Sequence, residues 1–297
     1  MKTLLVLFIV VGTFISFSVA AEGASDWRVP NADSVIVMQL DSGQVVIELA
    51  PQFAPVHVAN IKQLIADGYF DGTVILRSQD NYVVQWGDPA IESAEAEHDL
   101  AHAKSIGKAQ AKVAVEFFRD IKDIDFQSIE SRDAYADYVG FVDGFPAASD
   151  GKRAWLAHCY GMVGVSRANE DDSGNGSGLY VVTGHSPRHL DRNVTLVGRV
   201  LQGMELLASL PRGTGPLGFY EAAAEYIPIN TIQLSSSVQK PAPSFEIMNT
   251  NSLAFKEHVA KRTTRSEDWF LESTGKIELC NVGVPSRKLT EASNKGS

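Results

Sequence analysis

Short runs rich in β-branched residues recur along this chain, and Gly, Asn, Asp or Pro bounds each of them. Such runs are typical of β-strands, and their boundaries are typical of turns. They cover residues 34–40, 44–49, 73–77, 82–86, 161–166, 178–183, 194–200 and 227–234. Because helices do not alternate with these runs, the pattern argues against βαβ units and predicts a mainly antiparallel, closed sheet.

Two helix-like segments accompany the strands. The first begins at Pro55, a residue favoured in a first helical turn, and carries Val58, Ile61 and Leu64 at helical spacing. Gly68 stands where a helix C-cap belongs. A second, shorter helix is expected over residues 204–210.

The N-terminal segment indicates export. Lys2 precedes an almost unbroken apolar run over residues 4–19, and the small residues Ala20 and Ala21 follow. This pattern predicts a cleaved signal peptide over residues 1–21. The competing interpretation is an uncleaved membrane anchor, but the run is shorter than the ~20 residues that span a bilayer. No later segment could cross a membrane, so we expect no stable span after cleavage.

Composition excludes several classes of protein. Lys and Arg number 26 against 36 Asp and Glu, a net charge of −10, which argues against nucleic acid as a partner. With two cysteines in 297 residues, the chain is not a disulfide-rich protein whose fold depends on many cross-links. In an exported protein Cys159 and Cys280 could be joined in a disulfide, and the alternative is two inert buried thiols.

Two blocks of the sequence carry a family resemblance. In the first, the run 68–73 (GYFDGT) precedes Arg77, and Gln85 follows eight residues later. In the second, residues 176–181 (GSGLYV) precede residues 196–200 (LVGRV). Together, and in this order, they resemble the cyclophilin family of peptidyl-prolyl isomerases. The resemblance implies an eight-stranded antiparallel barrel capped by two helices.

The resemblance also divides the chain. A cyclophilin-like domain is expected over residues 34–234, interrupted by an insertion over residues 89–153. The insertion is expected to be partly helical because Ala, Glu, Lys and Gln dominate it through residue 110. The C-terminal extension, residues 235–297, is predicted to be α/β and packed on or tethered to the barrel.

The resemblance implies peptidyl-prolyl cis–trans isomerisation of exported proteins, with proline-containing polypeptides as partners and the periplasm as the compartment. Arg77 takes the position of the catalytic Arg that contacts the prolyl amide, and Gln85 that of a Gln that binds substrate backbone. The remaining pocket positions are apolar or aromatic: Tyr82, Val83, Tyr180 and Leu190. Rotation about a prolyl bond requires no cofactor or metal, and we predict none.

Three departures from the family pattern put rate and substrate preference in question. Gly178 stands where the family has a second Gln, and His189 where it commonly has Trp or Phe. Trp86 replaces a Gly and is expected to narrow or cover the cleft. The alternative function is therefore a catalytically weak barrel that binds Pro-containing segments or a partner protein.

A metal site is a further rival hypothesis. His98 and His102 stand four residues apart on an expected helix, the spacing of a zinc pair. Asp99 replaces the Glu that zinc proteases need at that place. We therefore interpret the pair as part of a solvated helix face and predict no metal.

Overall fold

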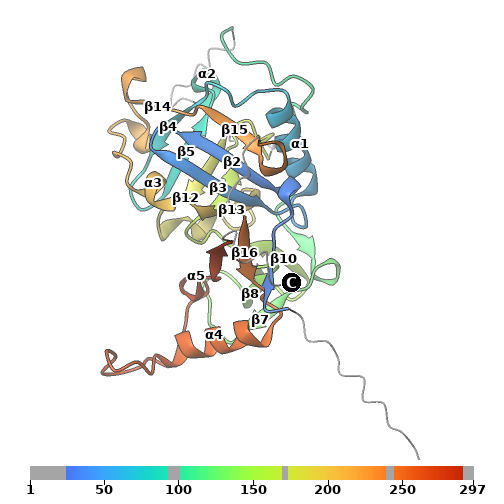
Figure 1. The fold of residues 1–297 in the computed structure, drawn as a ribbon, viewed down its shortest axis with the longest axis vertical. Helices are drawn as coiled ribbons and strands as arrows, with labels where there is room; N and C mark the ends of the chain where they lie inside the picture. Colours follow the sequence, from blue (N-terminus) through green and yellow to red (C-terminus); the bar gives the residue numbers. More distant parts are fainter. Residues whose placement is uncertain (1–24, 93–100, 169–172, 239–243, 290–297) are drawn as a thin grey trace, which may run out of the picture.

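The barrel is a curled antiparallel sheet (Figure 1). The computed structural model describes residues 25–92, 101–168, 173–238 and 244–289, so the predicted leader and His98 lie outside the described residues. Within them the sheet has nine strands in the order β14-β4-β5-β12-β11-β13-β3-β2-β15. Their bounds are β2 (Val35–Leu40), β3 (Gly43–Leu49), β4 (Val74–Ser78), β5 (Val83–Gly87), β11 (Met162–Val165), β12 (Leu179–Val182), β13 (Leu196–Gln202), β14 (Ile227–Pro228) and β15 (Thr231–Leu234). This architecture confirms the predicted mainly β fold class.

One run of chain borders both edges of this sheet. The run predicted as a single strand over residues 227–234 forms two short strands, β14 beside β4 and β15 beside β2. Between them, the Ile229 amide donates to the Thr73 carbonyl and the Asn230 amide donates to the Gln39 carbonyl. The sheet is closed by this run, which is why it contains nine strands rather than the predicted eight.

Alternation along the first hairpin explains its sequence. Ile36 and Met38 of β2 and Ile47 of β3 point into the barrel core, as expected for residues two apart on a strand. Val46, the neighbour of Ile47 in β3, points to the outer face of the sheet. It is also buried, because Phe245 of the C-terminal extension covers it there. Burial on both faces accounts for the continuous apolar runs in these strands.

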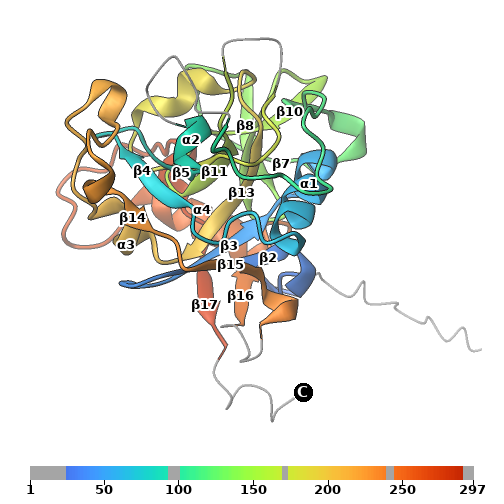
Figure 2. The ribbon, with the colours of Figure 1, turned by 90° about the horizontal axis from the view of Figure 1, so that it is seen from above.

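Helices α1 (Pro55–Ala66) and α3 (Met204–Ala208) lie on opposite sides of the curled sheet (Figures 1 and 2). Ile61 and Leu64 of α1 are fully buried in the barrel core. At the end of α1, Gly68 has a positive φ of 70°, and the Tyr69 amide donates to the Leu64 carbonyl. This is the C-cap geometry that a glycine permits.

Residues 25–28, 119–156 and 244–289 form a second layer below the barrel in Figure 1, which we call the outer module. Its larger sheet has the order β6-β10-β9-β8-β7 and its smaller sheet the order β1-β16-β17. The strands are β1 (Trp27–Arg28), β6 (Arg119–Asp120), β7 (Gln127–Ile129), β8 (Tyr138–Val142), β9 (Phe145–Ser149), β10 (Arg153–Leu156), β16 (Phe245–Met248) and β17 (Ser286–Lys288). Its helices are α4 (Leu253–Thr264) and α5 (Leu279–Val282).

The insertion is partly helical in its described residues, as expected, but its helices are short. Its one described α-helix is α2 (Pro89–Glu92), and residues 101–118 form turns and extended segments along α1. Their backbone amides are bound by polar side chains of that neighbourhood: Lys108 N–H donates to Asp67 and Gln110 N–H donates to Asn60. Tertiary hydrogen bonds therefore override the helical propensity of this segment.

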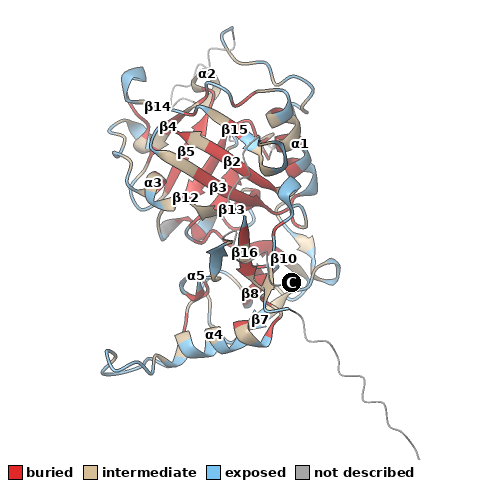
Figure 3. Cartoon of the chain, in the orientation of Figure 1, coloured by how far each residue is buried: buried red, intermediate tan, exposed pale blue. Residues whose placement is uncertain are grey.

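The C-terminal extension is α/β, as predicted. It contains the helix α4, which ends at Thr264, the short helix α5, and the strands β16 and β17. Figure 3 shows that α4 is largely exposed, whereas the barrel strands are buried. Among the described residues, no helix is long and apolar enough to cross a membrane.

The outer module and the barrel share an apolar core. Phe141 and Phe145 of the insertion pack in one cluster with Phe255 of α4 and with Tyr180 and Val182 on the outer face of β12. The structure joins the sulfurs of Cys159 and Cys280, which links the extension to the chain just before β11. The extension is thus packed on the barrel and covalently tied to it.

Candidate active site

A bulge in β4 turns Arg77 out of the barrel core. Ile75 pairs with Trp86 and Arg77 pairs with Gln85, so Leu76 is an extra residue on this strand. Bulges redirect side chains in this way. As a result Arg77 and Gln85, predicted from their spacing to act together, face each other on the same surface, and the Arg77 Nη1–H donates to Gln85 Oε1 at 3.0 Å.

The guanidinium of Arg77 is held from several sides. Its Nε–H donates to the Leu217 carbonyl at 2.8 Å, and its Nη2–H donates to Gln79 Oε1. The rings of Phe219 and Tyr82 lie 5.2 and 5.7 Å from its central carbon. Burial lowers the pKa of Arg77 from its ordinary value, although Tyr82 opposes this shift. An arginine remains charged despite such a shift, so the site contains a fixed, partly desolvated cation.

Gln85 is bound at both ends of its side chain. Its Oε1 accepts from Arg77, and its Nε2–H donates to Glu92 Oε2 at 2.8 Å. The Ser166 hydroxyl also donates to Glu92 Oε2, at 2.6 Å. The first helix of the insertion therefore brings a carboxylate to the predicted site.

Tyr180 and Val83 lie on the neighbouring strand pair. Tyr180 of β12 pairs with Gln85, and Val182 pairs with Val83 of β5. Tyr180 is 5% exposed and Val83 is 2% exposed. Both side chains therefore lie beneath the surface that carries Arg77 and Gln85 and line it from below. This position fits the apolar wall that the resemblance implies.

A buried chain of hydrogen bonds fixes the Tyr180 ring. His158 Nε2 lies 2.8 Å from the Tyr180 hydroxyl, and His158 Nδ1 lies 2.8 Å from Asp191 Oδ1. Burial lowers the pKa of His158, although the hydrogen bond that Asp191 accepts from it opposes this shift. A neutral His158 donates from Nδ1 to the carboxylate, so its Nε2 accepts from the tyrosine hydroxyl. The same burial raises the pKa of Tyr180 well above its ordinary value, which keeps the phenol protonated.

Tyr82 and Leu190 border the site from another element. The Tyr82 ring stacks on His189 with the ring centroids 5.9 Å apart. His189 belongs to the 3-10 helix Ser186–Leu190, which ends at the partly buried Leu190. The structure thus places Tyr82 and Gln85 against Arg77, whereas Leu190 is related to the site only through its chain neighbour His189, which stacks on Tyr82.

The expectation for Trp86 was wrong. Its side chain is fully buried in the barrel core, because Trp86 pairs with the inward-facing Ile75, so it does not narrow or cover the cleft. A second departure, Gly178, does change the site, because Glu92 fills the space beside it.

Sequence reasoning missed three contributors to the site: Glu92, Phe219 and His158. Glu92 and Phe219 come from a short helix and a loop that have no strand or motif signal. Tyr180 carries a hydroxyl at a position predicted to be apolar or aromatic, and this hydroxyl could have prompted a search for a buried partner such as His158.

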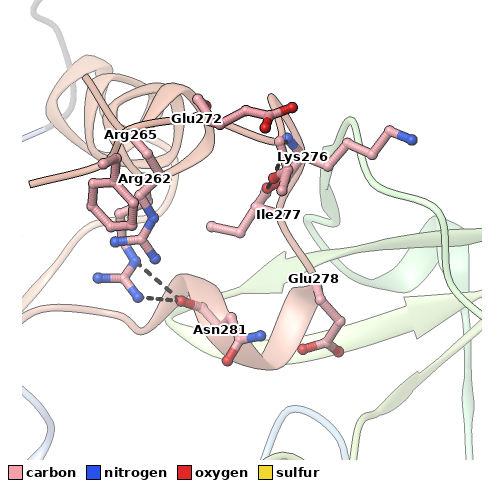
Figure 4. Close-up of a pocket in the computed structure, with 10 residues that line it drawn as sticks. Arg262, Arg265, Glu272, Lys276, Ile277, Glu278 and Asn281 are labelled. Atoms are coloured by element: carbon pink, nitrogen blue, oxygen red, sulfur yellow. Dashed lines mark hydrogen bonds between the residues drawn. The ribbon is translucent and has the colours of Figure 1, made fainter. Parts of the chain in front are cut away.

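Other hollows and clusters lie outside this site. A cavity of about 340 Å³ in the C-terminal extension is lined by charges of both signs, including Arg262, Arg265 and Glu272 (Figure 4). Two of the Arg262 N–H groups donate to the Asn281 carbonyl there, at 3.0 and 2.6 Å. Within the described ranges, no group of three or more His, Cys, Asp or Glu side chains could hold a metal ion. The Arg77 surface is therefore the best-formed candidate for chemistry.

Known proteins match both the sequence and the fold. The family model for cyclophilin-type peptidyl-prolyl cis-trans isomerases matches residues 35–233. A probable peptidyl-prolyl cis-trans isomerase of Brucella suis is 23% identical over 201 residues, which cover 68% of this chain and 82% of that protein. The peptidyl-prolyl cis-trans isomerase-like 3 protein of Mus musculus is 25% identical over 177 residues, covering 60% of this chain and 81% of that protein.

A solved structure extends the match beyond the family model. The crystal structure of cyclophilin AquaCyp293 from Hirschia baltica superposes with a TM-score of 0.66 and 26% identity, covering 88% of this chain and 93% of that chain. The match covers more than residues 35–233, so it includes part of the outer module as well as the barrel. The chain belongs to the cyclophilin-type peptidyl-prolyl cis–trans isomerase family, and it is an enzyme of that class.

Proposed function

We propose that this enzyme accelerates rotation about X-Pro bonds in exported proteins and that Arg77 is its catalytic residue. The barrier to this rotation is ~18–20 kcal/mol, because the nitrogen lone pair is delocalised into the carbonyl. A donor that binds the prolyl nitrogen localises this lone pair and weakens the double-bond character. The observation on which the proposal depends is the fixed, partly desolvated Arg77 guanidinium beside Gln85.

The contacts of Arg77 leave donors for a substrate. An arginine has five N–H groups, and the hydrogen bonds to Leu217, Gln79 and Gln85 leave one N–H on each Nη atom. A charge-assisted hydrogen bond contributes about 1.5–3 kcal/mol, which corresponds to about 10- to 100-fold in rate. The remaining acceleration would come from the apolar surroundings, where Tyr82 and Phe219 flank the cation and exclude water.

Gln85 and the aromatic wall would orient the peptide. The Gln85 carboxamide lies next to the guanidinium, at a place where it can reach substrate backbone. The Val83 and Tyr180 side chains beneath it provide an apolar floor for the proline ring. The predicted leader and the Cys159–Cys280 disulfide support an oxidising, exported setting such as the periplasm.

The test is a protease-coupled isomerase assay on a short X-Pro peptide. We expect Arg77→Ala to lower kcat/KM by at least about tenfold and Arg77→Lys to recover only part of it, because a lysine lacks the planar donor fork. Arg287→Ala, at an exposed ion pair in the extension, is the matched control and should leave the rate unchanged. Wild-type activity in Arg77→Ala would exclude this mechanism.

One observation favours a second candidate, a weak isomerase that mainly binds Pro-containing segments. Both ends of the Gln85 side chain are already engaged within the protein, by Arg77 and by Glu92. A substrate must therefore displace or share these bonds. Saturable binding of a Pro-containing peptide, in calorimetric titration, without measurable isomerisation would establish this alternative.

A further inference from the structure

Two glycines on neighbouring strands leave a slot beside Gln85. Gly87 ends β5 and Gly178 precedes β12, and the pairing of Leu179 with Trp86 sets the two glycines side by side. A Cβ atom on Gly87 would lie 3.2 Å from the Gly178 Cα atom and 2.8 Å from Glu92 Cγ. A Cβ atom on Gly178 would lie 2.1 Å from Glu92 Oε1. Either side chain would collide with Glu92, so the slot and its occupant fit each other.

The helix that presents Glu92 is anchored at the edge of the barrel. Asp88 is 4% exposed, and its carboxylate accepts from the Ala90 amide at 3.1 Å and from the Lys104 amide at 2.6 Å. The Asp88 carbonyl accepts from the Glu92 amide at 2.9 Å. The backbone of Glu92 is thus fixed by a buried residue that itself follows β5 directly.

The carboxylate of Glu92 determines which way the Gln85 carboxamide faces. A carboxylate accepts hydrogen bonds and cannot donate them, whereas a guanidinium donates and cannot accept. With Glu92 on one side and Arg77 on the other, the Gln85 NH2 group must face Glu92 and its Oε1 must face Arg77. In the flipped orientation, donors would meet donors at Arg77 and acceptors would meet at Glu92.

We propose that Glu92 is a positioning residue of the active site, supplied by the insertion where position 178 has no side chain. It fixes the Gln85 amide and, through it, the guanidinium of Arg77. The hydroxyl of Ser166, which donates to the same Glu92 oxygen, holds the carboxylate in the slot. This inference rests on the proposed role of Arg77.

The experiment compares Glu92→Ala, Glu92→Gln and Arg77→Ala in the full chain with the same X-Pro peptide assay. We expect Glu92→Ala to lower kcat about three- to tenfold with a smaller change in KM, in line with the loss of one charged hydrogen-bond partner. Glu92→Gln retains an acceptor and should recover part of kcat. In NMR spectra, the two Gln85 side-chain NH2 resonances should shift in Glu92→Ala, and the Arg77 Nε–H resonance should shift with them.

Two further variants separate positioning from a loosened insertion. Glu116→Gln alters another insertion carboxylate, one that accepts from the Val56 and His57 amides of α1, and is expected to keep wild-type kcat and Gln85 resonances. Gly178→Ala should lower kcat in the wild-type background, because the added methyl would lie 2.1 Å from both Glu92 Oε1 and Ser166 Oγ and so displaces the Glu92 carboxylate. In the Glu92→Ala/Ser166→Gly background, which lacks both of these groups, the same substitution should have little effect.

The outcomes distinguish the two proposals. If Arg77→Ala keeps wild-type activity, the proposed function is wrong. If Arg77→Ala loses activity while Glu92→Ala keeps wild-type activity or exceeds it, only the role of Glu92 is overturned. Equal losses of kcat in Glu92→Ala and Glu116→Gln would also overturn it, as would unchanged Gln85 resonances. The same holds for a Gly178→Ala effect that is as large in the Glu92→Ala/Ser166→Gly background as in the wild type.

Discussion

The barrel and the outer module are stabilised by different kinds of contact. The barrel core is a continuous cluster of apolar side chains, such as Ile47 and Val163, that come from the strands of one sheet and from the helices α1 and α3 that cap it. The core of the outer module is completed by the barrel itself, through Tyr180 and Val182. Segments distant in sequence are joined there by a disulfide and by buried ion pairs. The barrel is therefore specified by the pattern of its own strands, whereas the outer module depends on a few specific ties.

Removal of the disulfide should destabilise the outer module relative to the barrel more than any other change. Cys159 and Cys280 are 121 residues apart, and closure of such a loop is worth about 5 kcal/mol in the chain-entropy treatment. We expect Cys159→Ala/Cys280→Ser to lower the free energy of unfolding of the outer module by up to that amount. In urea titrations, the fluorescence of Trp155, buried in the outer module, should then change before the β-sheet circular dichroism of the barrel.

The control is the oxidised wild-type protein, in which both signals should change together. A double variant whose Trp155 transition still coincides with barrel unfolding, at the wild-type urea concentration, would mean that the outer module does not depend on the disulfide.

Removal of Arg188 should have the second largest effect. Its guanidinium donates to both oxygens of Asp133 at 2.8 Å and to Asp191 at 2.9 Å, and all three side chains are buried. Arg188→Met leaves two buried carboxylates without their cation, which typically costs about 3–5 kcal/mol. Urea unfolding measures the loss. The exposed pair in Arg287→Met is the matched control, expected to lose under about 1 kcal/mol.

A loss in Arg188→Met no greater than in Arg287→Met would show that the buried network contributes nothing beyond an exposed pair. Because Asp191 also binds His158, we expect a second consequence near Tyr180, namely a change in the environment of its ring that is visible in aromatic NMR resonances.

A smaller, pH-dependent effect should come from His158. Burial lowers its pKa in the folded protein, so the unfolded chain binds a proton more readily than the folded one. The free energy of unfolding therefore loses nothing to His158 above the ordinary histidine pKa of about 6.5. It declines as the pH falls below that value. The decline is at most about 1.4 kcal/mol per pH unit for one proton.

The measurement is the free energy of unfolding at about pH 7.5, 6 and 5 for the wild type and His158→Gln. The glutamine variant should have a shallower dependence on pH, since position 158 no longer titrates. Parallel curves for the two proteins would contradict a neutral, buried His158.

The sequence predicted the barrel well because its strands obey simple local rules. Runs such as 34–40 and 44–49 are bounded by turn residues, and they form β2 and β3. The insertion was harder. Its hairpin β8–β9 turns at Asp143 and Gly144, both with positive φ, and this Asp-Gly pair between apolar runs was an available signal. Residues 101–118, in contrast, follow α1 through tertiary hydrogen bonds that composition cannot reveal.

The site was predictable only in part for a similar reason. The spacing of Arg77 and Gln85 identified the pair, and the bulge at Leu76 brings them together. The place of Glu92 depends on the register of β5 and β12, which sets Gly87 beside Gly178. Register of this kind is a property of strand pairing across distant segments, so one sequence does not reveal it.

The pairing of β1 with β16 has a consequence for the order of assembly. Trp27 pairs with Met248, whereas every strand of the barrel lies between these two residues in the sequence. During synthesis from the N-terminus, the barrel strands can therefore meet while β1 still lacks its partner. Contacts between such distant segments form slowly. We expect the two ends of the described chain to join last, fastening a finished barrel rather than guiding its formation.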